Sequence, residues 1–287
     1  MATNKMFSYI ELTKPSIMVL VIIAGMTSLI VEGSLLAKPL LMVVFAIGLF
    51  LTGGSANALN QYFERDIDSK MTRTCSRRPL PLQKISGAQA LIFSITIGLA
   101  GVLLYAFVFN LLTALLALAT ILFYGIFYTL WLKPHTSMNI VIGGIAGAMA
   151  PVGAWTAATG SMAIMPWLIF LIIFFWTPPH FWSLALKFKD DYRKTGLPML
   201  PVARGDEETF RQIYYYTIVL FIISLLPLLI NFGWIYLAVT INLGAIFIKR
   251  VIEAKRHKSD VMAWGVFKYS IVYLFALLSA MVVDKFV

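Results

Sequence analysis

Residues Gly87–Val108 read GAQALIFSITIGLAGVLLYAFV, a run without a single Asp, Glu, Lys or Arg. A helix of this length crosses the roughly 30 Å hydrocarbon core of a bilayer. The composition agrees, because 60% of the residues are hydrophobic and 13% are charged, which would leave a water-soluble domain with large exposed apolar patches. Eight further apolar stretches bring the number to nine, at Pro15–Val31, Pro39–Tyr62, Leu111–Leu132, Met138–Ala158, Ile164–Leu186, Ile213–Ile230, Gly233–Ile248 and Ala263–Val283. The sequence therefore predicts an all-α polytopic membrane protein with nine transmembrane helices around a central cavity.

The basic residues predict the orientation of these helices. Lys and Arg fall before the first stretch and in every second connection, and only Lys38 and Lys285 fall on the other side. Because cytoplasmic loops collect positive charge, the amino terminus is expected inside and the carboxyl terminus outside. The formal charge of +10 follows from this asymmetry, and no nucleic-acid-binding module accompanies it. We expect an uncleaved, multi-pass protein of the bacterial plasma membrane.

The connection after the second stretch carries the first polar motif, NQYFERDIDSKMTRTCSRRPLP at Asn60–Pro81. At about 100° per residue, Asn60, Glu64 and Asp68 lie on one face of a helix, and Asn57 shares that face. Asp66 points away. Stacked carboxylates repel one another unless a cation lies between them.

Two readings of this acidic face are open from the residues alone. The carboxylates either pair with Arg65 or Lys70 at a solvated helix end, or they bind a magnesium ion shared with substrate phosphates. A basic cluster follows directly and favours the second reading, because guanidinium groups bind phosphate oxygens in pairs. The cluster consists of Lys70, Arg73, Arg77 and Arg78.

The sixth connection carries a second motif, TPPHFWSLALKFKDDYRKTGLPMLP at Thr177–Pro201. The paired prolines are expected to interrupt the helix next to a cavity. If helix resumes at His180, then His180, Lys187 and Asp191 share a stripe about 40° wide. Both motifs end with acidic residues, followed by basic residues and then by a Pro-rich segment. We expect one domain, 1–287, in which two similar polar loops at about 60–86 and 180–211 face one cavity.

These residues resemble the UbiA-type intramembrane prenyltransferases, whose members carry Asp-rich motifs after the second and sixth of nine helices. Asn60, Glu64 and Asp68 match the first motif, and Asp190 with Asp191 match the end of the second. The resemblance covers essentially the whole chain and is strongest to members that farnesylate protohaem IX. It implies farnesyl diphosphate as donor, haem B as acceptor, haem O as product and Mg²⁺ as cofactor. Besides the lipid bilayer, haem A synthase or terminal oxidase assembly proteins are the implied protein partners.

The resemblance also implies roles for individual residues. Catalysis is expected of Asn60, Glu64, Asp68, His180 and Lys187. The metal ligands are expected among Asn60, Glu64, Asp68, Asp190 and Asp191. The diphosphate is expected to bind to Lys70, Arg73, Arg77, Lys133 and Arg193.

Some features depart from the family pattern or leave alternatives open. His180 and Lys187 stand where aromatic prenyltransferases usually have acids, so Lys187 is a candidate to replace a second metal ion. His180 has four possible roles: ligand of haem iron, partner of a propionate, catalytic base, or cap of a helix that restarts after Pro179. Another aromatic or quinone-precursor acceptor is the main alternative substrate. A secondary transporter is the alternative from another class, but its carboxylates belong near the bilayer midplane rather than at helix ends.

Overall fold

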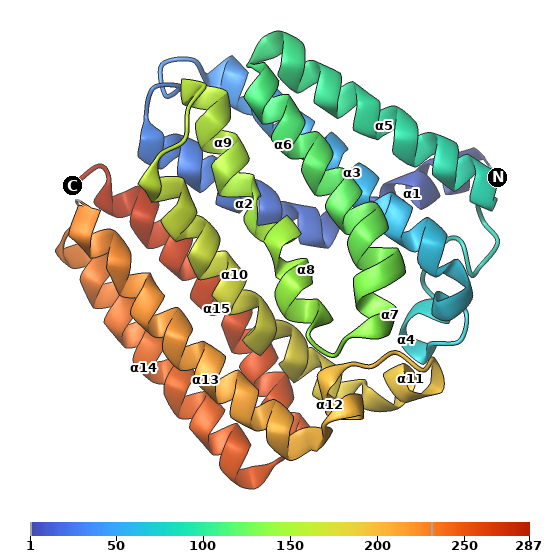
Figure 1. Ribbon diagram of the computed structural model, residues 1–287. Coiled ribbons are helices and arrows are strands. Elements are labelled where there is room, and N and C mark those ends of the chain that lie inside the picture. Colours follow the sequence, from blue (N-terminus) through green and yellow to red (C-terminus); the bar gives the residue numbers. More distant parts are fainter. Residues whose placement is uncertain (1, 231) are drawn as a thin grey trace.

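The computed structural model describes residues 2–230 and 232–287, and in this part of the chain the regular secondary structure is helical, with no strand (Figure 1). Nine of the described segments are long and apolar enough to span a membrane, as expected from the sequence. In chain order the elements are α1 (Ala2–Leu12), α2 (Pro15–Glu32), α3 (Pro39–Asp68), α4 (Thr72–Cys75), α5 (Gly87–Val108), α6 (Leu111–Leu122), the π-helix η1 (Phe123–Leu132), α7 (Lys133–His135), α8 (Asn139–Ala148), α9 (Ala150–Thr159), α10 (Ile164–Lys187), α11 (Lys189–Lys194), α12 (Leu200–Ala203), α13 (Gly205–Leu225), the 3₁₀ helix η2 (Leu226–Ile230), α14 (Trp234–His257) and α15 (Asp260–Asp284).

The predicted all-α fold with nine membrane-spanning segments is thus confirmed for the described residues. The orientation of the termini stays a prediction. Two spans are composite, because α6 continues into η1 and α8 is followed by α9 after a break at Met149. Pro151 lies in the first turn of α9, where a residue without an amide proton is tolerated.

The helix α3 is longer than hydropathy predicts. The apolar stretch ends near Tyr62, but the helix continues to Asp68 and buries both Glu64 and Asp68. Hydropathy stops at the first charged residues, whereas the backbone continues as long as each buried charge finds a partner. The acidic motif is therefore part of the spanning helix and not of a loop.

The expected interruption of α10 at the paired prolines is wrong. Pro178 and Pro179 lie inside one helix that runs from Ile164 to Lys187. Both prolines are buried, and the hydroxyl of Ser183 donates to the carbonyl of Pro179 at 2.6 Å. Because α10 packs against α8, α13 and α15, tertiary contacts hold it in helical form despite the missing amide protons.

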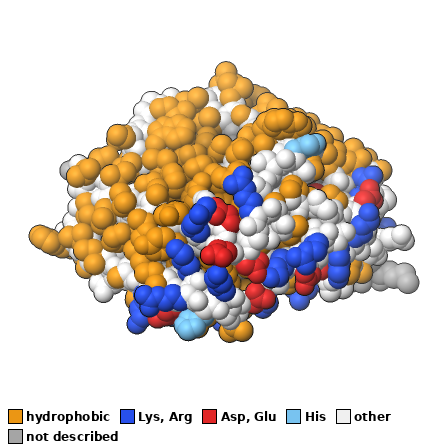
Figure 2. Space-filling model, turned by 60° about the horizontal axis from the view of Figure 1, so that its bottom comes forward, with side chains coloured by type: hydrophobic (Ala, Val, Ile, Leu, Met, Phe, Trp, Pro, Cys, Tyr) orange, Lys and Arg blue, Asp and Glu red, His pale blue; other side chains and the backbone are white. Residues whose placement is uncertain are grey.

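The short helices and the charged side chains gather at one end of the molecule. Figure 1 shows α4, α7, α11 and α12 together at the end where α3 and α10 finish. Seen from that end, Lys, Arg, Asp and Glu side chains crowd one region, and the rest of the visible surface is largely apolar (Figure 2). The chemistry-bearing motifs of α3 and α10 thus meet at one face.

Candidate active site

The centre of the candidate site is one face of α3. Asn57, Asn60, Glu64 and Asp68 recur at every third or fourth residue and are all buried. The side chain of Asp66, in contrast, is 86% exposed. The periodicity therefore separates these acids correctly into a buried face and a solvated one.

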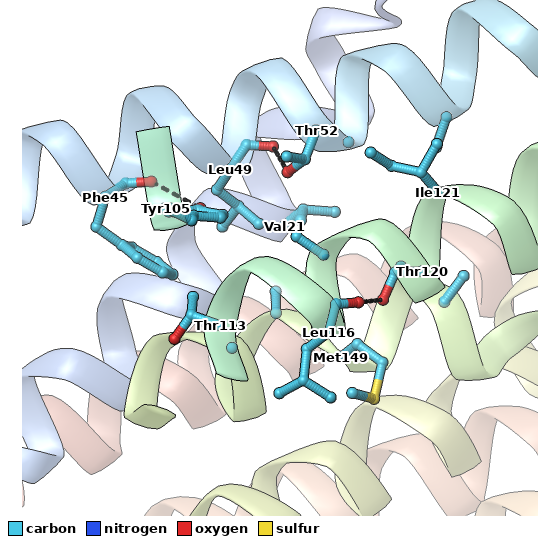
Figure 3. Close-up of a pocket in the computed structure, with 16 residues that line it drawn as sticks. Val21, Phe45, Leu49, Thr52, Tyr105, Thr113, Leu116, Thr120, Ile121 and Met149 are labelled. Atoms are coloured by element: carbon cyan, nitrogen blue, oxygen red, sulfur yellow. Dashed lines mark hydrogen bonds between the residues drawn. The ribbon is translucent and has the colours of Figure 1, made fainter. Parts of the chain in front are cut away.

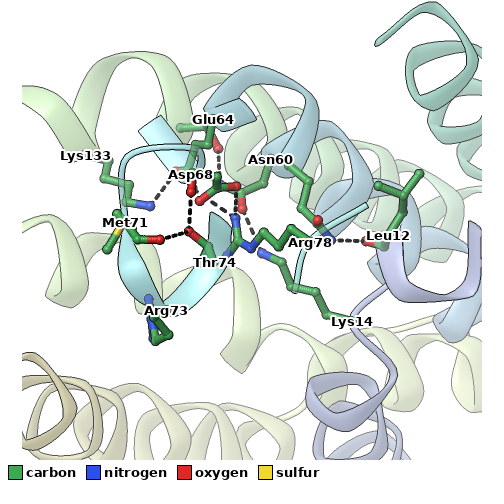
Figure 4. Close-up of polar contacts among 12 residues, drawn as sticks. Leu12, Lys14, Asn60, Glu64, Asp68, Met71, Arg73, Thr74, Arg78 and Lys133 are labelled. Carbon is green, nitrogen blue, oxygen red and sulfur yellow. Dashed lines mark hydrogen bonds and ion pairs between the residues drawn. The ribbon is translucent and has the colours of Figure 1, made fainter. Parts of the chain in front are cut away.

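Three cations converge on this face from three separate segments (Figure 4). Lys133 Nζ lies 2.5 Å from Glu64 Oε1, and Lys14 Nζ donates to Asn60 Oδ1 at 2.7 Å. Arg78 pairs directly with Asp68 and lies 3.8 Å from Glu64 Oε2. Three partly buried cations thus face two buried carboxylates, which leaves an excess of positive charge suited to an anion.

The turn before α2 directs Lys14 into the cluster. Lys14 has a left-handed backbone, with φ 53° and ψ 64°, a conformation that costs energy for a residue with a Cβ atom. Amide groups from α3 hold this turn: Gln61 donates to the carbonyls of Glu11 and Leu12, and Asn57 donates to that of Thr13 at 3.1 Å. Burial, together with the charge of Arg78, lowers the pKa of Lys14 to about 7.

The π-helix η1 supplies the wall opposite α3. A π-helical segment inside a longer helix often marks a functional site. Here Thr129 Oγ1 donates to the carbonyl of Tyr124 at 2.7 Å and accepts from Asn60 Nδ2 at 3.1 Å. Gly125 lets the two helices approach, since a Cβ atom there would lie 3.0 Å from the side chain of Leu59. Lys133 follows directly after η1 and thereby reaches Glu64.

The second motif joins the first through the loop after α3. The hydroxyl of Thr74 donates to the carbonyl of Asp68 at 2.7 Å, and the amide of Arg73 donates to Asp191 Oδ2 at 3.0 Å. Although burial opposes ionisation, hydrogen bonds from the backbone of Arg73 and from Thr72 lower the pKa of Asp191. The guanidinium of Arg73 donates to the hydroxyl of Tyr192 at 3.3 Å. The structure thus brings together Arg73 and Asp191, which lie in different motifs.

Other residues expected in the site have more solvated positions. Lys70 and Arg77 are exposed. Asp190 and Arg193 form an exposed pair with each other at 2.9 Å. Lys187 is exposed, with its Nζ 3.9 Å above the ring of Trp264. Their assigned roles stay predictions.

His180 lies on the side of α10 that faces α15. Its ring is buried and stacks between Trp176 and Phe267, at centroid distances of 4.3 and 4.5 Å. Its Nδ1 lies 2.8 Å from the hydroxyl of Ser270. Because α10 is unbroken, the role as cap of a restarted helix is wrong.

An apolar pocket continues the same face of α3 (Figure 3). Phe45, Leu49, Thr52 and Ala56 line it together with residues of α2, α5, α6, α8 and α9. From Phe45 to Ala56 the helix rises by about 16 Å. Asn60 lies one turn beyond Ala56, so the pocket and the charged cluster lie end to end along one helix.

The side-chain oxygen atoms on this face of α3 are of the type that binds a divalent metal ion. Within the described residues, no three His, Cys, Asp or Glu side chains converge as a ready-made metal site. Asn60, Glu64 and Asp68 nevertheless present a neutral oxygen and two carboxylates on one face, each bound to a cationic side chain. Such a donor set suits Mg²⁺ that shares its coordination with phosphate and water.

Two features of this cluster escape the sequence motifs. Lys14 has no local pattern that marks it, apart from its place just before Pro15. Arg78 belongs to the basic cluster, but no sequence signal distinguishes it from its exposed neighbour Arg77. The contacts of Lys14 with Asn60 and of Arg78 with Asp68 join separate segments of the chain. Only the packing of the helices therefore reveals them.

Known proteins share this fold and sequence. The model of the UbiA prenyltransferase family matches residues 18–277. Proteins named protoheme IX farnesyltransferase are 44% identical in a Synechocystis species and 45% identical in Gloeobacter violaceus, over 97% and 96% of this chain and 89% and 91% of theirs. A relative of the same name from Roseiflexus castenholzii is 42% identical over 96% of this chain, which spans about half of its length, 52%.

Two solved structures have the same fold at low identity. A structure described as digeranylgeranylglyceryl phosphate synthase has a TM-score of 0.80 at 21% identity and covers 98% of both chains. A UbiA homologue from Archaeoglobus fulgidus, bound to GPP and Mg²⁺, has a TM-score of 0.62 at 16% identity, over 96% of this chain and 99% of its own. With a family match over residues 18–277 and relatives at 44–45% identity along nearly their whole length, the chain belongs to the UbiA prenyltransferase family.

Proposed function

We propose that the chain transfers a farnesyl group from farnesyl diphosphate to a vinyl group of haem B, with addition of water, to give haem O. The observation that carries this proposal is the continuous face of α3. Its amino-terminal part lines an apolar pocket, and its carboxyl-terminal part carries two carboxylates that three cationic side chains approach. An apolar tail and an anionic head are the two parts of a prenyl diphosphate. The names of the relatives supply the acceptor.

The diphosphate is proposed to bind where the cations now meet the carboxylates. Lys14, Arg78 and Lys133 would turn from their carboxylate and amide partners toward the phosphate oxygens, as guanidinium and ammonium groups favour. Asn60, Glu64 and Asp68 would hold Mg²⁺, which neutralises the charge that develops on the departing diphosphate. Burial makes each of these interactions stronger than it is in water.

The reaction then proceeds by loss of diphosphate. The bond between C1 of the farnesyl group and its oxygen breaks, and the diphosphate leaves with the electron pair. The vinyl group of haem B attacks the allylic cation, and water adds to the new cation next to the ring and releases a proton. The stacked rings of Tyr124 and Tyr128, with centroids 5.2 Å apart, lie on η1 beside Thr129. An aromatic face stabilises a cation that lies within about 6 Å of its ring centroid.

Production of haem O tests the proposal. Haems are extracted from membranes of a host without its own haem O synthase and separated by chromatography with mass detection. Cells with the chain should contain haem O, and cells with equal amounts of the Glu64→Gln variant should not. Absence of haem O from cells with the wild-type chain overturns the assignment, and a different prenylated product would identify another acceptor. We also propose residence in the bacterial plasma membrane, which fractionation of the same cells tests.

A further inference from the structure

His180 belongs to a column of stacked side chains between α10 and α15. The planes of His180 and Trp176 differ by 21°, and those of His180 and Phe267 by 29°. The column continues from Phe267 to Trp264, at 4.7 Å and 13°. With both faces covered, the imidazole can meet other groups only through its edges.

One edge of the ring meets Ser270, and the geometry there fixes a proton. Ser270 Oγ lies 2.8 Å from His180 Nδ1 and 2.6 Å from the carbonyl oxygen of Phe267. A hydroxyl has one proton, and a carbonyl oxygen can only accept. If the hydroxyl donated to His180, two oxygens would face each other at 2.6 Å without a proton between them. Ser270 therefore donates to Phe267, and His180 Nδ1–H donates to Ser270.

This arrangement leaves a lone pair on the opposite edge of the neutral ring. In neutral imidazole only one nitrogen carries a proton, so Nε2 does not. Within residues 2–230 and 232–287, Nε2 of His180 has no hydrogen-bond partner. It is nevertheless absent from the set of fully enclosed side-chain atoms without a partner. Nε2 is therefore not completely covered, in a residue that is 8% exposed and has the ring of Phe181 beside it at 5.0 Å and 87°.

We propose that Ser270 is a positioning residue that holds His180 in the Nδ1–H tautomer, so that Nε2 binds the iron of the acceptor porphyrin. Histidines that bind metals through one ring nitrogen commonly donate from the other to an oxygen. The same tautomer rules out donation by neutral His180 Nε2 to a propionate. The inference rests on the proposed function, because haem B is the acceptor there.

The proton position is measured first, without haem and without activity. The chain has three histidines, His135, His180 and His257, so the ¹⁵N spectrum of histidine-labelled protein is simple, and His135→Gln and His257→Gln variants assign it. His180 should show a protonated Nδ1 and an unprotonated Nε2. Ser270→Ala should weaken that preference, and Ser270→Thr, which retains the hydroxyl, should restore it. A wild-type His180 protonated at Nε2 overturns the proposal.

Haem binding and turnover are measured next on the purified full chain. Loss of a supporting contact of this kind costs about 10- to 100-fold in metal affinity or activity. We expect Ser270→Ala to weaken haem B binding by such a factor, to shift the Soret band toward that of His180→Ala, and to slow farnesylation.

Ser224→Ala is the matched control. Ser224 is also a fully buried helical serine, and it contacts the hydroxyl of Tyr273 at 2.8 Å. It should keep the wild-type spectrum and haem affinity. If Ser270→Ala matches wild type in spectrum and rate while the wild type forms haem O, the positioning role is overturned and the proposed function stands. If haem binding depends on Ser270 as predicted but the wild type forms no haem O, the proposed function is wrong and the positioning role of Ser270 stands.

Discussion

The carboxylate of Asp191 accepts a hydrogen bond of 3.0 Å from the backbone amide of Arg73, 118 residues earlier in the chain. This contact ties α11 to α4, which carries Thr74 and is followed directly by the segment with Arg78. It therefore connects the second polar motif to the cations and carboxylates at the end of α3.

Removal of the Asp191 carboxylate should loosen this connection. In Asp191→Ala the partly buried amide of Arg73 loses its partner, at a cost of about 1–3 kcal/mol. We expect a KM for farnesyl diphosphate about 5- to 150-fold higher, because 1.4 kcal/mol corresponds to a factor of ten. Asp190→Ala is the control, since its exposed pair with Arg193 contributes little. Similar KM values in the two variants would contradict the role of this contact.

The carboxylates of α3 differ in their expected contribution. Glu64→Gln and Asp68→Asn should each lower kcat/KM by about 100-fold or more, roughly 2.7 kcal/mol of transition-state stabilisation. Asp66→Asn should retain most activity, because that side chain is 86% exposed. Kinetics with purified protein, combined with thermal unfolding, separate chemistry from stability. An equal loss at all three positions would mean that this segment only maintains the fold.

The apolar pocket should determine which donors are accepted. Gly153 lines the pocket, and a Cβ atom there would meet nothing within 4 Å. A Gly153→Phe side chain therefore enters the cavity without a clash near the backbone and takes space from the prenyl chain. We expect preference to shift from farnesyl toward geranyl diphosphate by about tenfold or more, since each displaced methylene costs about 0.8 kcal/mol.

Gly147→Phe is the matched control for this pocket variant. Its Cβ atom would also meet nothing within 4 Å, but Gly147 is an exposed residue of α8 that does not line the pocket. Initial rates with the two diphosphates should keep the wild-type ratio in Gly147→Phe. A ratio that also stays unchanged in Gly153→Phe would place the prenyl chain elsewhere.

The predicted orientation can be measured with single cysteines. Cys75 is the one cysteine in the chain, so Cys75→Ser provides a background without thiols. In that background, Ser161→Cys should react with a membrane-impermeant maleimide in intact cells, and Ser76→Cys should react only after permeabilisation. Both positions are exposed. The reverse pattern would place the charged end of the molecule outside.

Local periodicity determined much of this protein from the sequence alone. Apolar runs such as Gly87–Val108 predict the spanning helices, because a backbone in lipid must satisfy its own hydrogen bonds. The spacing of Asn60, Glu64 and Asp68 predicts their common face, since neighbours on a helix lie three or four residues apart. These are properties of single helices, which need no knowledge of what surrounds them.

The tertiary structure decided which helices face one another. A lipid-facing helix surface is as apolar as a buried one, so hydropathy cannot identify neighbours. The contacts of Lys14 with Asn60 and of Lys133 with Glu64 span 46 and 69 residues, and His180 meets Ser270 across 90. Packing likewise kept α10 helical through Pro178 and Pro179, where local propensity predicts a break. The sequence thus predicts where the spanning helices lie and which face of a helix is polar. The charge balance of the site and the proposed tautomer of His180 arise only where distant segments come together.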